Sequence, residues 1–161
     1  LLFLDEPTTG LDPQSRRALW DTVAAYKKRG KTVVLTTHYM DEAERLCDRV
    51  AVVDRGRLIA LGTPRQLIGS LGAAHIVDLA ADRALESPLF DGIPSLQSVH
   101  ALTDDPTGAQ HRLAVAEPSV ALPALFTRVA EAGGRVTSLS MRHATLEDVF
   151  VSLTGRQLRD D

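Results

Sequence analysis

The chain has 161 residues, a formal net charge of −3 and a single cysteine. This length allows one compact core or two small ones, and a hydrophobic content of 44% excludes wholesale disorder and fibrous repeats. One cysteine excludes a disulfide framework and suits a reducing cytosol. No apolar run reaches the ~20 residues of a membrane-spanning helix, and the slight acidity gives no general attraction to nucleic acid or to an anionic membrane.

The first predicted elements form a strand–helix–strand unit. Residues 1–4, Leu-Leu-Phe-Leu, are a continuous apolar run typical of a strand buried on both faces of a parallel sheet, and Pro7 ends this strand. Asp12 is the expected N-cap of a helix over 13–29. A β-branched strand over 32–37 follows, and the helical crossover between the strands makes them parallel.

Shorter elements come next. We expect an amphipathic helix over 40–48, two strands over 49–53 and 57–61 around a tight turn, and a helix ending near Leu71. The pattern changes at residues 69–74, where a domain boundary is predicted.

The rest of the chain predicts a small α+β domain. Its strands alternate polar and apolar residues, as half-buried antiparallel strands do, and its helices form the second layer. The predicted strands cover 76–80, 98–102, 111–116 and 136–141, and the helices cover 119–132 and 146–153. The predicted domains are therefore 1–72 (α/β) and 75–155 (α+β), followed by a polar tail over 156–161.

Three chemically versatile side chains follow the two parallel strands. Asp5 and Glu6 come just after the first strand, and His38 comes just after the second. Parallel strands end at one edge of their sheet, where open α/β sheets bind ligands. An Asp-Glu pair alone is more often a solvated loop, and a lone histidine is more often structural, but together at one edge they favour a site. Such a set suits a divalent cation, a phosphate and an activated water.

The motifs resemble those of one enzyme family. Residues 1–12, Leu-Leu-Phe-Leu-Asp-Glu-Pro-Thr-Thr-Gly-Leu-Asp, resemble the Walker B strand and D-loop of ATP-binding-cassette (ABC) ATPases, and Thr36-Thr37-His38 resembles their switch histidine. The resemblance extends to about Leu71. The remainder resembles more loosely the C-terminal accessory domain of ATPases that serve drug-resistance-type bacterial exporters, with Leu-Glu-Asp-Val-Phe at 146–150.

The resemblance implies a role for each matching residue. Asp5 would order Mg²⁺, directly or through water, Glu6 would act as general base on the attacking water, and His38 would contact the γ-phosphate of ATP. The D-loop residues Gly10, Leu11 and Asp12 would lie at the interface of a nucleotide-sandwich dimer.

The resemblance also implies a fold and partners. The fold would be the C-terminal part of a P-loop NTPase parallel sheet, followed by the accessory domain. The protein would be the ATP-binding subunit of an ABC transporter of the exporter type. It would hydrolyse ATP with Mg²⁺ as a dimer with a second ATPase subunit and drive an integral-membrane permease, without nucleic acid. It would lie in the cytoplasm, peripheral to the inner face of the membrane.

Several family motifs have no counterpart in these residues. No G-x-x-x-x-G-K-[ST] phosphate loop and no Leu-Ser-Gly-Gly signature occur. In the family both precede the Walker B strand, so we expect the chain to be a C-terminal fragment that is inactive alone. Two alternatives are a non-catalytic regulatory or interaction module and an ABC ATPase of the DNA-repair type.

Overall fold

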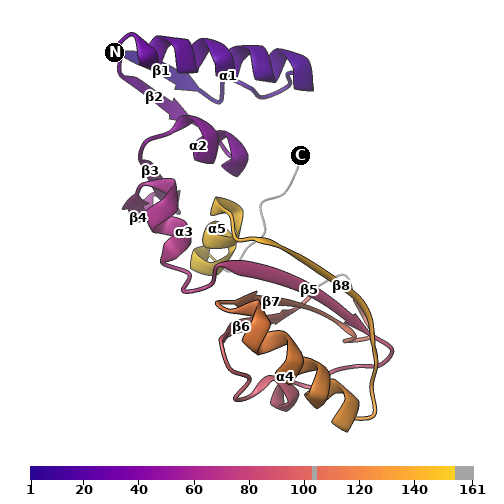
Figure 1. The fold of residues 1–161 in the computed structure, drawn as a ribbon. Coiled ribbons are helices and arrows are strands. Elements are labelled where there is room, and N and C mark those ends of the chain that lie inside the picture. Colours follow the sequence, from indigo (N-terminus) through magenta and orange to yellow (C-terminus); the bar gives the residue numbers. More distant parts are fainter. Residues whose placement is uncertain (103–104, 155–161) are drawn as a thin grey trace. The chain divides into compact units, whose positions relative to one another are not determined.

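The computed structural model describes residues 1–102 and 105–154 (Figure 1). Its contacts group the chain into two compact units, one of Leu1–Leu67 with the residues from Thr145 onward, and one of Ile68–Ala144. The predicted polar tail at 156–161 lies outside the described residues. Within the described ranges, none of the helices combines the length and the apolarity needed to cross a membrane.

The first unit opens with a parallel strand pair joined by a helix. Strands β1 (Leu2–Asp5) and β2 (Val33–Thr36) pair in parallel, with Leu2 opposite Val33 and Asp5 opposite Thr36. Helix α1 (Pro13–Lys28) connects them. The parallel pairing predicted from the crossover is confirmed.

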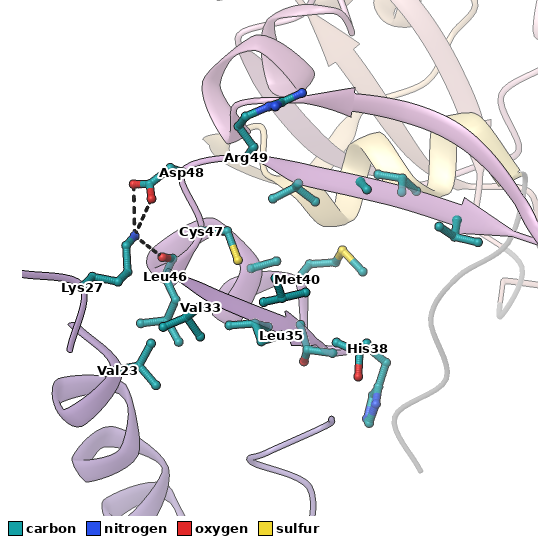
Figure 2. Close-up of a pocket in the computed structure, with 18 of the residues that line it drawn as sticks. Val23, Lys27, Val33, Leu35, His38, Met40, Leu46, Cys47, Asp48 and Arg49 are labelled. Carbon is teal, nitrogen blue, oxygen red and sulfur yellow. Dashed lines mark hydrogen bonds and ion pairs between the residues drawn. The ribbon is translucent and has the colours of Figure 1, made fainter. Parts of the chain in front are cut away.

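One face of this strand pair is packed. Trp20 and Val23 of α1 form a buried cluster with Leu46, against which Val33 and Leu35 of β2 pack (Figure 2). The other face of β1 is open, since Phe3 is 70% exposed. Burial of both faces of the first strand was predicted, and within the described residues this is wrong, because α1 covers only one of them.

The rest of the first unit consists of short elements. The turn between β3 and β4 holds Arg55 and Gly56 at φ 48° and 72°, the left-handed backbone that tight hairpin turns need. Helix α5 (Leu146–Thr154) also belongs to this unit, although its residues were predicted to lie in the second domain. The backbone N–H of Leu146 donates to Glu44 Oε2 of α2 (Met40–Leu46) at 3.2 Å. The elements are α2 (Met40–Leu46), β3 (Val50–Asp54), β4 (Arg57–Gly62), α3 (Pro64–Gly69), which reaches into the second unit, and α5 (Leu146–Thr154).

The second unit is an antiparallel sheet with a helix across it. The sheet has four strands in the order β6-β7-β5-β8, with every neighbouring pair antiparallel. The antiparallel sheet expected from the alternating pattern is confirmed, whereas the short 3-10 helix η1 was not predicted. The elements are β5 (His75–Ala81), η1 (Ser87–Phe90), β6 (Leu96–Ala101), β7 (Gln110–Val115), α4 (Pro118–Glu131) and β8 (Val136–His143).

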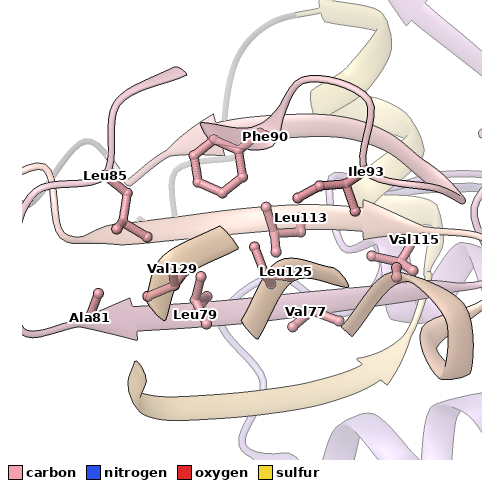
Figure 3. Packing of buried hydrophobic residues seen from close by; sticks show 11 residues of the cluster. Val77, Leu79, Ala81, Leu85, Phe90, Ile93, Leu113, Val115, Leu125 and Val129 are labelled. Atoms are coloured by element: carbon pink, nitrogen blue, oxygen red, sulfur yellow. The ribbon is translucent and has the colours of Figure 1, made fainter. Parts of the chain in front are cut away.

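The core of the second unit lies between the sheet and α4 (Figure 3). Val77 of β5 and Leu113 of β7 meet Leu125 and Val129 of α4, and all four are at most 2% exposed. Burying a side chain of this size stabilises the fold by roughly 1.5–3 kcal/mol. This unit therefore has a core of its own, and the chain as a whole is a mixed α/β protein with small sheets.

Candidate functional site

The predicted site begins where β1 ends. Glu6 has a positive φ of 42°, uncommon for a residue with a side chain. Its backbone N–H is held by Thr36 at the end of β2, donating to the carbonyl oxygen at 3.0 Å and to Oγ1 at 3.1 Å. The Thr36 hydroxyl in turn donates to Asp5 Oδ1. One threonine thus fixes the two adjacent acids at the carboxyl edge of the strand pair.

Glu6 and His38 face each other across this edge. Oε2 of Glu6 lies 3.4 Å from Nδ1 of His38 and accepts a hydrogen bond from Thr9 Oγ1 at 3.2 Å. Their side chains are 49% and 38% exposed, so a ligand can reach both. The expectation from parallel topology, that these residues meet at one edge, holds for this pair, and their chemical roles stay predictions.

The aromatic ring of Tyr39 packs beside the imidazole of His38. The imidazole and the Tyr39 ring lie 4.2 Å apart between centroids, and the Arg16 guanidinium of α1 stands over the Tyr39 ring at 4.6 Å. This places a cation over the negative face of the ring. Arg16 and Tyr39 were not predicted as part of the site, because only the fold brings α1 beside the residue after His38.

The predicted D-loop leads directly into α1. Gly10 has a φ of 76°, which glycine adopts without strain, and Leu11 is partly exposed. Asp12 caps α1 as predicted, since Oδ1 accepts the backbone N–H groups of Gln14 at 2.9 Å and Ser15 at 3.0 Å. The Ser15 hydroxyl, followed by these N–H groups, lowers the pKa of Asp12. The cap anchors one end of the loop that carries Glu6.

Few side chains in the described part of the chain are placed to bind a metal ion together. In the described ranges, no three His, Cys, Asp or Glu side chains are grouped so as to hold a metal ion. Mg²⁺ is commonly held by one or two carboxylates together with phosphate oxygens and water. The exposed carboxylate of Asp5 fits that kind of open site, in which phosphate oxygens and water are the further ligands.

A pocket of about 860 Å³ lies beside the strand pair, with His38 at one end (Figure 2). Its opposite end is polar, because Lys27 Nζ donates to Asp48 Oδ1 at 3.0 Å. Cys47 also lines it, and burial raises the pKa of this thiol. The lining between the two ends is mostly apolar, from β2, α2 and β3, so it is unsuited to hold phosphate groups by itself.

A buried glutamate lies next to the site and was not predicted. Glu42 of α2 is 0% exposed, as is Thr8 of the loop that follows Glu6. The Glu42 carboxylate accepts hydrogen bonds from Thr8 and from Trp20. No sequence pattern indicates this burial, because the donors are 34 and 22 residues away along the chain.

Known proteins resemble the chain over nearly its whole length, although no family model matches it. It is 43% identical over 160 residues to the Nod factor export ATP-binding protein I of Cupriavidus metallidurans, covering 99% of this chain and 49% of that protein. It is 40% identical over 163 residues to the daunorubicin/doxorubicin resistance ATP-binding protein DrrA of Streptomyces peucetius, covering 99% and 48%. With the linearmycin resistance ATP-binding protein LnrL of Bacillus subtilis the identity is 37% over 160 residues, covering 99% and 51%.

The names of these relatives are consistent with the ABC-type motifs found at the carboxyl edge of β1 and β2. The chain spans about half the length of the curated relatives it matches. All three are named as ATP-binding proteins, and their names refer to export or to drug resistance. Over nearly all of its residues, the chain is homologous to ATP-binding proteins of ABC transporters.

Proposed function

We propose that the full-length protein is an ATPase subunit of an ABC exporter and hydrolyses ATP in the presence of Mg²⁺. The observation that carries this proposal is the meeting of Glu6 and His38, 3.4 Å apart, at the carboxyl edge of a parallel strand pair. That edge is where open α/β sheets bind ligands. In the proposed fold, β1 and β2 are two strands of a larger parallel sheet of the P-loop NTPase type.

Each residue at the edge has a distinct part in the proposed reaction. Asp5 would hold Mg²⁺, directly or through water, and a bound ion would supply positive charge to offset that of the phosphates. The Glu6 carboxylate takes a proton from a water whose oxygen attacks the γ-phosphorus, while the bond from that phosphorus to the ADP oxygen breaks. His38 contacts the γ-phosphate, where charge builds up in the transition state.

The loop after β1 supplies the proposed contact with a second subunit. Gly10, Leu11 and Asp12 lie between Glu6 and α1 on exposed chain, so a partner can reach them without displacing the core. Both nucleotide sites then sit at the dimer interface, and hydrolysis drives an integral-membrane permease. The proposal includes a location in the cytoplasm, at the inner face of the membrane, and no nucleic-acid partner. Export as the direction rests on the names of the relatives.

We expect the 161 residues alone to bind Mg-ATP weakly or not at all, because they contain no phosphate loop. A calorimetric titration of the 161-residue chain with Mg-ATP tests this. Saturable binding at micromolar ATP would contradict it.

ATP hydrolysis by the full-length protein tests the main proposal. Phosphate release should require Mg²⁺, and Asp5→Asn should raise the Mg²⁺ concentration needed for half-maximal rate. The matched control is Asp21→Asn, because Asp21 is exposed on α1 and remote from the proposed reaction. A full-length protein that releases no phosphate from ATP, or does so equally well without a divalent ion, would overturn the proposed function.

A further inference from the structure

The side chain of Glu42 joins three segments of the first unit. Its Oε2 accepts a hydrogen bond from Thr8 Oγ1 at 3.2 Å, and its Oε1 accepts one from the indole N–H of Trp20 at 3.1 Å. Thr8 belongs to the loop after β1, Trp20 to α1, and Glu42 to α2. A carboxyl group with no exposed surface needs such partners, because burying it unpaired is costly.

The joined segments are those that carry the proposed reacting groups. Thr8 stands two residues after Glu6, in a tightly turned loop where Thr9 N–H donates to Glu6 O at 3.2 Å and Leu11 N–H to Thr8 O at 3.1 Å. Glu42 stands four residues after His38, in the first turn of α2. The Thr8–Glu42 hydrogen bond therefore links the Glu6 loop to the His38 segment through two fully buried side chains.

We propose that Glu42 is a positioning residue for hydrolysis, which holds the Glu6 loop and the His38 segment in register through Thr8 and Trp20. This inference rests on the proposed function. Glu42 itself does not reach the nucleotide, because it is fully buried. Its effect on the reaction is through the separation of Glu6 and His38, to which proton transfer and phosphate contact are sensitive.

Two substitutions of Glu42 can separate the effect of its hydrogen bonds to Thr8 and Trp20 from the effect of its negative charge. The Trp20 indole only donates, whereas the Thr8 hydroxyl both donates and accepts. In Glu42→Gln, the amide oxygen can still accept from Trp20 and the amide N–H can donate to Thr8, so both bonds survive without the charge. In Glu42→Leu, a side chain of similar bulk makes neither bond.

The experiment measures steady-state ATP hydrolysis by the full-length protein and its variants. Glu42→Leu should lower kcat roughly 10- to 100-fold and change the KM for ATP by no more than about twofold, as expected when only transition-state positioning is lost. Glu42→Gln should restore most of kcat. The control is Asp41→Asn, which removes a charge from the neighbouring exposed side chain and keeps Oδ1, the acceptor for the Glu42 N–H.

A second variant keeps the test decisive if Glu42→Leu does not fold. Thr8→Val retains the shape of Thr8 but cannot donate to Glu42, and should show the same split between kcat and KM. Thr22→Val is its control, since Thr22 lies exposed on α1 and its hydroxyl donates to the Ala18 carbonyl of the same helix. The ¹H–¹⁵N indole signal of Trp20, identified by its loss in Trp20→Phe, should move in Glu42→Leu and stay near its original position in Glu42→Gln.

The outcomes also distinguish this inference from the proposed function. If Glu6→Gln abolishes turnover while Glu42→Leu and Thr8→Val keep the original kcat, the function stands and the positioning role falls. A Glu42→Gln variant as slow as Glu42→Leu would overturn it too, because the charge and not the bonding would then matter. If Glu6→Gln hydrolyses ATP at the original rate, Glu6 is not the base, and the positioning role of Glu42 falls with it. The proposed function itself fails only if the unaltered full-length protein releases no phosphate from ATP or needs no divalent ion.

Discussion

Nδ1 of His38 lies 3.4 Å from Oε2 of Glu6, although 31 residues separate the two positions in the chain. The contact exists because β1 and β2 run parallel and end together, with Asp5 opposite Thr36. Thr36 strengthens the arrangement by binding the backbone N–H of Glu6 and the carboxylate of Asp5. The residue proposed as the base and the residue proposed to contact phosphate thus directly follow two paired strands, which support both segments.

Replacement of Glu6 by glutamine tests its role as the base. Glu6→Gln keeps the shape of the side chain and can still accept from Thr9 Oγ1, but an amide does not take up a proton. In the full-length protein, turnover should fall by about 100-fold or more, with ATP affinity retained. Phosphate release and equilibrium nucleotide binding measure the two effects, and an unchanged turnover number would remove Glu6 as the base.

Removal of the His38 imidazole tests its contact with the γ-phosphate. In His38→Ala, hydrolysis should fall by roughly 100-fold, the cost typical of losing one donor to a transition-state oxyanion, and ATP affinity should fall less. His100→Ala is a suitable control because His100 is exposed on β6 of the second unit. Equal losses in affinity and turnover would show that His38 merely holds the nucleotide.

The hydrogen bonds of Asp105 should make one loop of the second unit less stable in strong acid. The Thr107 hydroxyl, with the backbone N–H groups of Thr107, Ala109 and Gln110, lowers the pKa of Asp105 from 3.8 to about 2. A carboxyl group whose pKa is lower in the folded than in the unfolded chain stabilises the fold at any pH above its unfolded pKa. This contribution should therefore disappear as the pH falls from about 4 towards 2. Carboxyl ¹³C shifts should give a midpoint near 2, and Thr107→Ala should raise it; a midpoint at 3.8 in the unaltered protein would contradict this assignment.

Local patterns predicted most of the fold because they repeat within one element. The β-branched run before His38 predicted β2, and Asp12 before Pro13 predicted the start of α1. Alternation predicted the antiparallel sheet of the second unit. The short helix at Ser87–Phe90 was missed, because one turn of 3-10 helix is too short to show a period.

The predicted site was incomplete for a different reason. Asp5 ends β1, and Glu6 and His38 come after β1 and β2, so topology alone predicts that they share an edge. Glu42 and Arg16 acquire their positions from packing between elements. The apolar stripe of α2 marks Ala43 and Leu46 as inward-facing, whereas Glu42 is buried only because Thr8 and Trp20 supply donors. Such a pairing depends on three segments at once and leaves no periodic signal.

Neighbouring residues on α4 provide a matched test of the core in the second unit. Leu125 is 2% exposed and packs against β5 and β7, whereas Phe126 is 43% exposed. Leu125→Ala removes buried methyl groups and leaves a cavity, so the free energy of unfolding should fall by about 2–5 kcal/mol. Phe126→Ala should change it by no more than about 0.5 kcal/mol, as is usual for surface positions. Urea unfolding followed by circular dichroism measures both. A larger loss for Phe126→Ala than for Leu125→Ala would mean that α4 presents its other face to the sheet, and the packing in Figure 3 would be wrong.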